Sequence, residues 1–222
     1  MNNFGKVSET RKLTYFAILT ALTLVLQLVG NQVKIGIVTL NFSLIPIVLC
    51  AILLGVWYGT ALGAITGLII LLNNGILGAD GFTNVLFGVQ PVVIIFVCIL
   101  KTALAGALSA LIFKWMYKVN KYVGTFLAAG IVPVINTLIF VLGMLLIVPS
   151  LVSVGFIAEG ANAFTTIIVG FVGLNFVFEF AVNLIVAPAI FRVVTVIDKS
   201  FIGGSKDSET EESIKTDDKA ED

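Results

Sequence analysis

Residues 91–113 read PVVIIFVCILKTALAGALSALIF, an apolar run in which Lys101 is the only charged residue. A helix needs about 20 such residues to cross the roughly 30 Å hydrocarbon core of a bilayer. Comparable runs fill most of the 222-residue chain, which is 59% hydrophobic and 12% charged, with a mean hydropathy of +1.11. Soluble domains carry about 25% charged residues. The composition therefore excludes a soluble enzyme and predicts an integral membrane protein.

Hydropathy predicts an all-α protein, a compact bundle of six transmembrane helices. The predicted spans cover residues 13–29, two segments within 42–72, and residues 91–113, 123–148 and 165–191. We divide 42–72 near Gly55-Val56-Trp57-Tyr58-Gly59, because one helix of that length would be unusual and because Trp and Tyr are enriched at membrane interfaces. The membrane domain then covers residues 13–200 and follows a cytoplasmic N-terminal segment at 1–12.

Residues 201–222 are predicted to form a disordered, acidic cytoplasmic tail. From Ser205 to Asp222 the chain has eight acidic residues and three lysines, and it lacks the apolar periodicity of a packed helix. We expect this tail to keep the C-terminal end solvated. A docking peptide is the alternative.

Lysine and arginine gather in three segments that predict the orientation of the chain. The groups are Lys6, Arg11 and Lys12 before the first span, Lys114, Lys118 and Lys121 between the fourth and fifth, and Arg192, Lys199 and Lys206 after the sixth. Basic residues are retained on the cytoplasmic side of a membrane. With an even number of spans all three groups lie on that side, so both termini are predicted to be cytoplasmic.

The residues used most often in catalysis and metal binding are scarce. The chain has no histidine, and its two cysteines, Cys50 and Cys98, lie in apolar runs where a free thiol behaves as a small hydrophobic group. It also has no phosphate-binding P-loop sequence. We therefore expect no catalytic residues, no cofactor, no metal site and no nucleic-acid partner.

Small residues recur at a spacing of four in two of the predicted spans. Gly59, Gly63 and Gly67 lie on one face of the third span, where missing side chains let a neighbouring backbone approach closely. This run predicts tight helix packing rather than an activity. Ala17 and Ala21 form a similar pair in the first span, and a smooth patch for a helix of another protein is its functional interpretation.

Polar side chains inside the predicted spans are the strongest indication of function. They are Lys101, Asn136, Thr137, Asn175, Glu179 and Asn183. A charge in hydrocarbon costs free energy, so such residues usually face an interior cavity. Asn175, Glu179 and Asn183 follow one helix face at a spacing of four. The pattern predicts a site for a small molecule, in which Lys101 meets an anionic group while Glu179 and the asparagines meet hydroxyls and amides.

Two further asparagines join Lys101, Asn136, Thr137, Asn175 and Glu179 as the seven candidate substrate-binding residues, namely Asn41 before the second span and Asn84 in the loop at 73–90. That loop and the one at 149–164 are either plain connections or lids over an outward-facing pocket. An ion pair between Lys101 and Glu179 that only joins two helices is the alternative to a ligand site.

Several strings together resemble the substrate-binding S components of energy-coupling factor (ECF) transporters, over roughly residues 8–200. These are Arg11-Lys12-Leu13 leading into AILTA at 17–21, TLNFSLIP at 39–46, and LGVWYG at 54–59 followed by Gly63 and Gly67. Val56 departs from the family pattern, which usually has proline or a small residue there. The segments at 98–106 and 132–144 look like those of pantothenate-type members.

The resemblance implies a prokaryotic plasma-membrane subunit that captures a vitamin at the outer face. It also implies partners, namely a transmembrane coupling protein that docks at Ala17 and Ala21 and two ATP-binding subunits. For pantothenate, Lys101 suits the carboxylate, and Asn136, Asn175 and Glu179 suit the remaining polar groups.

Other functions stay open at this point. Folate, cobalamin or riboflavin are alternative vitamins. A self-contained secondary carrier for a small polar anion would use Glu179 as a protonation or cation site. A membrane scaffold without a ligand would have little reason to bear the cost of Lys101 and Glu179 inside its spans.

Overall fold

The computed structural model describes residues 9–35 and 38–217, and it describes side chains up to residue 197 apart from those at 34 and 35. The elements in chain order are α1 (Glu9–Gly30), β1 (Lys34–Ile35), β2 (Val38–Thr39), α2 (Leu44–Leu54), α3 (Val56–Ile70), the π-helical η2 (Leu71–Ile76), α4 (Gly81–Val89), α5 (Pro91–Met116), α6 (Lys121–Leu146), α7 (Val148–Ser153), α8 (Ala163–Thr165), the π-helical η3 (Thr166–Gly173) and α9 (Leu174–Asp217). The two strands form an antiparallel hairpin.

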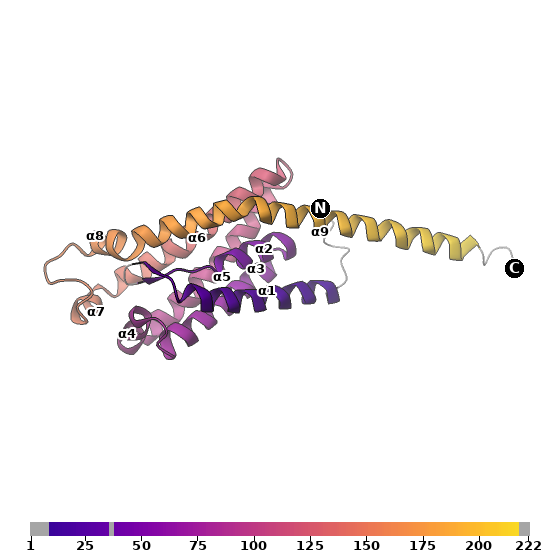
Figure 1. Cartoon of the computed structure of the whole chain (residues 1–222). Helices are drawn as coiled ribbons and strands as arrows, with labels where there is room; N and C mark the ends of the chain where they lie inside the picture. Colours follow the sequence, from indigo (N-terminus) through magenta and orange to yellow (C-terminus); the bar gives the residue numbers. More distant parts are fainter. Residues whose placement is uncertain (1–8, 36–37, 218–222) are drawn as a thin grey trace.

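In the part of the chain that the structure describes, five helices are long and apolar enough to cross a membrane. They cover Glu9–Gly30, Val56–Ile76, Pro91–Met116, Lys121–Leu146 and Ala163–Ile197. The predicted second span differs, because α2 has only 11 residues and so extends about 16 Å, roughly half of the hydrocarbon core. In Figure 1 the β1–β2 hairpin lies between α2 and the end of the bundle that holds α4 and α7. Five of the six predicted spans therefore have membrane-length helices among the described residues, and a sixth span at α2 stays a prediction.

The short helix α2 lies in the centre of the bundle rather than at its lipid-facing surface. Leu44, Ile47, Val48 and Cys50 are fully buried in it. Continuous hydropathy made this segment look like a span, because a helix surrounded by other helices is as apolar as one surrounded by lipid.

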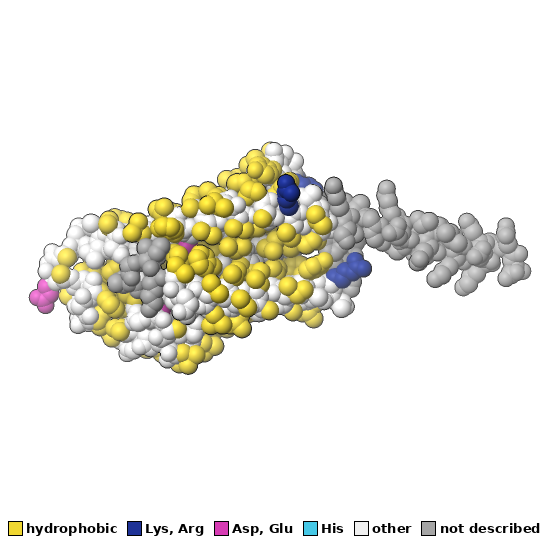
Figure 2. All heavy atoms as spheres, in the orientation of Figure 1, with side chains coloured by type: hydrophobic (Ala, Val, Ile, Leu, Met, Phe, Trp, Pro, Cys, Tyr) yellow, Lys and Arg dark blue, Asp and Glu magenta, His cyan; other side chains and the backbone are white. Residues whose placement is uncertain are grey.

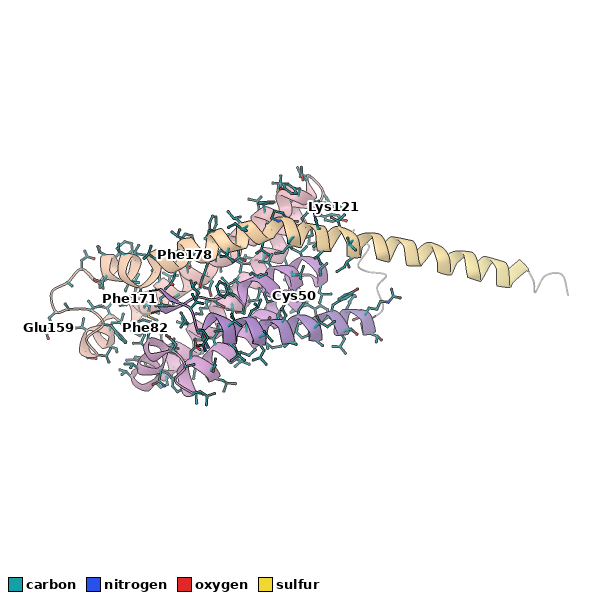
Figure 3. All side chains as sticks on the ribbon, viewed as in Figure 1. Cys50, Phe82, Lys121, Glu159, Phe171 and Phe178 are labelled. Atoms are coloured by element: carbon teal, nitrogen blue, oxygen red, sulfur yellow. The ribbon has the colours of Figure 1, made fainter. Side chains whose placement is uncertain are left out.

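The ends of the bundle differ in charge. α1 begins, and α9 leaves the bundle, at the end where α5 connects to α6 (Figure 1). Lysine and arginine lie at this end in Figure 2, while Glu159 marks the opposite end in Figure 3. This arrangement fits termini on one side of the membrane, and their cytoplasmic location stays a prediction. Below, the end that holds the α5–α6 connection is called the basic end, and the opposite one the loop end.

Helix α9 continues to Asp217, across most of the acidic segment. The sequence predicts disorder for residues 201–222. That expectation stays a prediction, because the structure describes only the backbone of 198–217 and residues 218–222 lie outside its described part.

Two apolar clusters fill the bundle, one toward each end. The cluster at the basic end contains Ala105 of α5, Val132 of α6 and Ala187 of α9. The other contains Cys98 of α5, Val141 of α6 and Phe171 of η3. On all three of these chain segments the polar residues predicted from the sequence fall between the two clusters.

The glycine run of α3 packs directly on the backbone of α5. A Cβ atom on Gly63 would lie 2.2 Å from the carbonyl oxygen of Thr102, and one on Gly67 would lie 2.4 Å from that of Cys98. Gly59 faces Gly106, where an added Cβ would lie 2.2 Å from the Gly59 carbonyl oxygen. Such distances leave no room for side chains, so these glycines set the separation of α3 and α5.

Gly63→Ala should lower the free energy of unfolding in detergent by about 1–3 kcal/mol, the usual cost of overpacking a tight contact. Thermal unfolding followed by circular dichroism measures the effect. Ala61→Val is the matched control, because Ala61 is exposed on the same helix. Equal stability of the Gly63→Ala and wild-type proteins would contradict this packing.

Candidate functional site

A cavity of about 50 Å³ lies between the two apolar clusters. Its lining comes from β2 and the following turn, α5, α6, η3 and α9, and consists of Val38, Thr39, Asn41, Lys101, Asn136, Thr137, Phe140, Phe171, Val172, Asn175, Phe176 and Glu179. Six of the seven residues predicted from the sequence to bind substrate are among these: Asn41, Lys101, Asn136, Thr137, Asn175 and Glu179. Segments separated by more than a hundred residues therefore bring the predicted polar set to one place.

Asn84 does not line this cavity. Its side chain donates a hydrogen bond to the carbonyl oxygen of Gly75 at 2.7 Å, and so ties α4 to η2. The start of α4 is fixed in the same region by Asp80, which accepts a hydrogen bond from the backbone N–H of Thr83 at 3.0 Å. Asn84 thus shapes a loop, and we draw no binding role from its position.

The polar face of α9 holds the β1–β2 hairpin and the turn after it. Glu179 Oε1 accepts a hydrogen bond from the backbone N–H of Asn41 at 2.9 Å. Asn175 Nδ2 donates to the carbonyl oxygen of Val38 at 3.4 Å and to that of Phe171 at 3.3 Å. Asn183 instead donates to the Glu179 carbonyl oxygen within its own helix, at 2.8 Å. Two residues of the stripe therefore act on the hairpin, a role that the sequence does not reveal.

Lys101 and Glu179 line the same cavity without forming an ion pair with each other; the one ion pair among the described side chains joins Lys12 and Glu9. The Lys101 ammonium lies 5.5 Å from the centre of the Phe140 ring, within the range of a cation–π contact. Its charge is therefore placed at the cavity and not neutralised by a direct carboxylate contact.

Several buried amide atoms of the cavity have no hydrogen-bond partner among the described residues. They are Asn41 Nδ2, Asn136 Oδ1 and Asn175 Oδ1. A buried polar atom left unpaired costs about 1–3 kcal/mol, so such atoms usually meet water or a ligand. One donor and two acceptors on the wall of a single cavity form a set that a small polar molecule can satisfy.

A buried chain of polar side chains joins the cavity to α1. Gln27 Nε2 donates to Asn31 Oδ1 at 3.1 Å, and Ser43 Oγ lies 3.1 Å from Gln27 Oε1. The Ser43 hydroxyl also contacts Asn41 Oδ1, although its single proton is donated to one acceptor at a time. Sequence reasoning missed Gln27, Asn31 and Ser43. The spacing of four between Gln27 and Asn31, at the end of an apolar run, is a signal that could have indicated these two residues.

The two long loops lie on the loop-end side of the cavity. Phe82 of α4 stacks against Phe156 and Phe171, with ring centres 4.8 and 5.2 Å apart, and Figure 3 labels Phe82 and Phe171 at this end of the bundle. Gln90 Nε2 also donates to Ser150 Oγ at 2.9 Å, which links one loop region to the other. Residues of both loops thus pack over a cavity-lining aromatic ring.

The described cavity is small for an organic ligand. About 50 Å³ accommodates a water molecule or a few, whereas small-molecule sites usually measure about 300–1,000 Å³. A larger ligand requires movement of the lining. Two described side-chain hydrogen bonds, from Glu179 and Asn175 of α9, hold the hairpin and the turn after it.

A bundle of membrane-length helices around a small polar cavity defines a helical membrane protein with a polar site in its interior. The comparison with protein families agrees with this class, since residues 11–191 match the family described as ECF transporter, substrate-specific component. The match covers most of the chain, so the chain belongs to this family. Neither a curated protein nor a solved structure matches it.

Family membership defines the protein's general role. It is the substrate-specific subunit of an ECF transporter, a multi-pass plasma-membrane protein that binds a small molecule and works with the ECF membrane and ATPase modules. It is a transport subunit rather than an enzyme. The self-contained carrier and the scaffold considered above are therefore set aside.

Glu179→Ala should loosen the turn after β2, because it removes the acceptor of the Asn41 N–H bond. Amide hydrogen exchange of peptides covering residues 38–45 should become about five- to thirtyfold faster, the ratio for about 1–2 kcal/mol. Phe178→Ala is the control, because Phe178 neighbours Glu179 on α9 and is 49% exposed. Unchanged exchange in Glu179→Ala would show that this bond does not hold the turn.

Proposed function

We propose that this subunit captures pantothenate from outside the cell and delivers it through the ATP-driven coupling module. One observation carries the proposal: Lys101 lines the same cavity as three asparagines, Asn41, Asn136 and Asn175, each of which has an amide atom without a described hydrogen-bond partner. A site whose polar groups each need a partner discriminates strongly among ligands. Uptake of one specific small molecule demands such discrimination.

Pantothenate has one carboxylate, an amide and two hydroxyls. In the proposed complex Lys101 binds the carboxylate through a charge-assisted bond. Asn136 and Asn175 accept from the hydroxyls or the amide N–H through their unpaired oxygens, and Asn41 donates through its unpaired Nδ2. Glu179 and Thr137 provide further polar contacts.

Entry of a vitamin requires the cavity to open. The proposed route lies on the loop end, where the β1–β2 hairpin and the loops around α4 and α7 cover the site. Rupture of the Glu179 and Asn175 bonds to the hairpin would enlarge the cavity. The two predicted lids therefore act together with a third one, the hairpin.

A vitamin with an aromatic ring system is the second candidate. Phe140, Phe171 and Phe176 line the cavity, and rings favour offset or edge-to-face contact with a planar ligand. Riboflavin and folate carry such rings. Calorimetric titration of the purified protein with a vitamin panel distinguishes them from pantothenate.

We also propose that the coupling protein docks on α1 at Ala17 and Ala21. Both alanines are exposed, and so are Leu13 and Leu24 on the same helix face. Small side chains flanked by apolar ones allow a partner helix to approach closely within the bilayer.

Lys101→Ala should weaken pantothenate binding by about 2–5 kcal/mol, the range for truncating one partner of a buried charge pair. Isothermal titration calorimetry on the purified protein measures this difference. Arg11→Ala is the control, since Arg11 is an exposed cationic residue in the first turn of α1, away from the cavity lining. An unchanged affinity would remove Lys101 from the site, and absence of binding to every vitamin in the panel would refute the proposed function.

Ala17→Trp should abolish vitamin uptake by the complete transporter while the isolated subunit keeps its affinity, because the bulky ring separates the docking helices. Uptake of labelled vitamin into proteoliposomes that contain all subunits provides the measurement. Leu22→Trp, an exposed position on a different face of α1, serves as control. Normal uptake by Ala17→Trp would place the docking surface elsewhere.

A further inference from the structure

An apolar groove separate from the polar cavity opens between α5, α6 and α9. Its volume is about 540 Å³, and its walls include Trp115, Met116, Phe126, Gly130, Phe180 and Leu184. The floor lies at Gly130, where an added Cβ would be 3.4 Å from Phe180 Cε2 and 3.7 Å from Leu184 Cδ2. A hollow of this kind on a membrane-spanning surface is filled by an apolar molecule.

The groove begins at the basic end of the bundle. Trp115 and Met116 are in the last turn of α5, and Phe126 is near the start of α6. On α6 the groove continues to Val134, about 12 Å farther along the axis. One leaflet of the hydrocarbon core is about 15 Å deep. The groove therefore has the depth of one acyl chain in the leaflet at the basic end.

Basic residues follow the groove-lining residues in sequence at the end where the groove begins. Lys114 and Lys118 flank Trp115 in sequence, and Arg192 lies two turns beyond Leu184 on the same face of α9. All three are exposed, and lysine and arginine gather at this end in Figure 2. α6 has no acidic residue that would neutralise them.

We propose that this groove binds an anionic phospholipid. One acyl chain lies between α6 and α9 against Gly130, and the headgroup phosphate is held by Lys114, Lys118 and Arg192. Basic clusters beside transmembrane helices bind anionic headgroups in this way. Charge at one end and an apolar hollow behind it match a molecule with one charged head and an apolar tail. A partner helix has no need of the charges, so the lipid accounts for both features.

The two tryptophans of the chain allow a direct test. Trp115 lines the groove, while Trp57 lies outside it at the start of α3 and is 87% exposed. Both lie toward the basic end of the bundle, because Tyr58, next to Trp57, contacts Glu9 at the start of α1. Trp57→Phe leaves Trp115 as the sole fluorophore, and Trp115→Phe leaves Trp57. Each protein is reconstituted in phosphatidylcholine vesicles that contain either dibrominated phosphatidylglycerol or dibrominated phosphatidylcholine at the same mole fraction.

Bromine quenches a tryptophan that it touches, so quenching reports which lipid occupies the site. Trp115 should show an apparent affinity for phosphatidylglycerol about fivefold or more above that for phosphatidylcholine, and Trp57 should show little preference. In the Trp57→Phe background, Lys114→Gln, Lys118→Gln and Arg192→Gln together should remove the preference but leave quenching by phosphatidylcholine. Gly130→Leu, which fills the floor, should lower quenching by both lipids.

Equal quenching of Trp115 by the two lipids would overturn the proposal. The proposal would also be overturned if neither brominated lipid quenched Trp115 and cross-linking gave dimers, because a second copy of the chain would then cover the groove. The charge-neutralised variant decides the question even where Gly130→Leu fails to fold, since its substitutions are all exposed.

Discussion

The hydrogen bond between the Glu179 carboxylate and the backbone N–H of Asn41 connects the two parts of the molecule that enclose the cavity. A carboxylate within a membrane bundle is costly unless it has a polar partner. Here the partner comes from the turn that follows a short β-hairpin, 138 residues away in the sequence. The enclosed state of the site thus depends on a contact that spans most of the chain.

The polar layer explains why the core is divided into two apolar clusters. Each long helix of the site places an apolar segment on either side of its polar residues, so the cavity walls are fixed from both ends. Ser43 and Gln27 extend the layer to α1. In the proposed function α1 carries the docking surface for the coupling protein. A ligand that displaces Asn41 would therefore change the hydrogen bonds of Ser43 and Gln27, and through them act on α1.

Much of this arrangement is predictable from the sequence. Long apolar runs predict the helices, and rare intramembrane polar residues such as Lys101 and Glu179 predict the site, because their burial needs a common interior. The length of α2 is not predictable, since hydropathy cannot distinguish a helix buried in protein from one in lipid. Asn84 lies outside the cavity lining, and the sequence cannot show this, because an asparagine that bonds a nearby carbonyl looks the same in sequence as one that faces a ligand.

Native mass spectrometry of the subunit, released from the membranes in which it was produced, tests most directly whether the cavity holds a ligand. We predict a one-to-one complex with a small carboxylate-bearing molecule, released on activation and identified by its fragments, and a ligand-free protein when Asn136 and Asn175 are both replaced by leucine. A wild-type protein that carries lipid alone, even after incubation with each vitamin, would contradict the account.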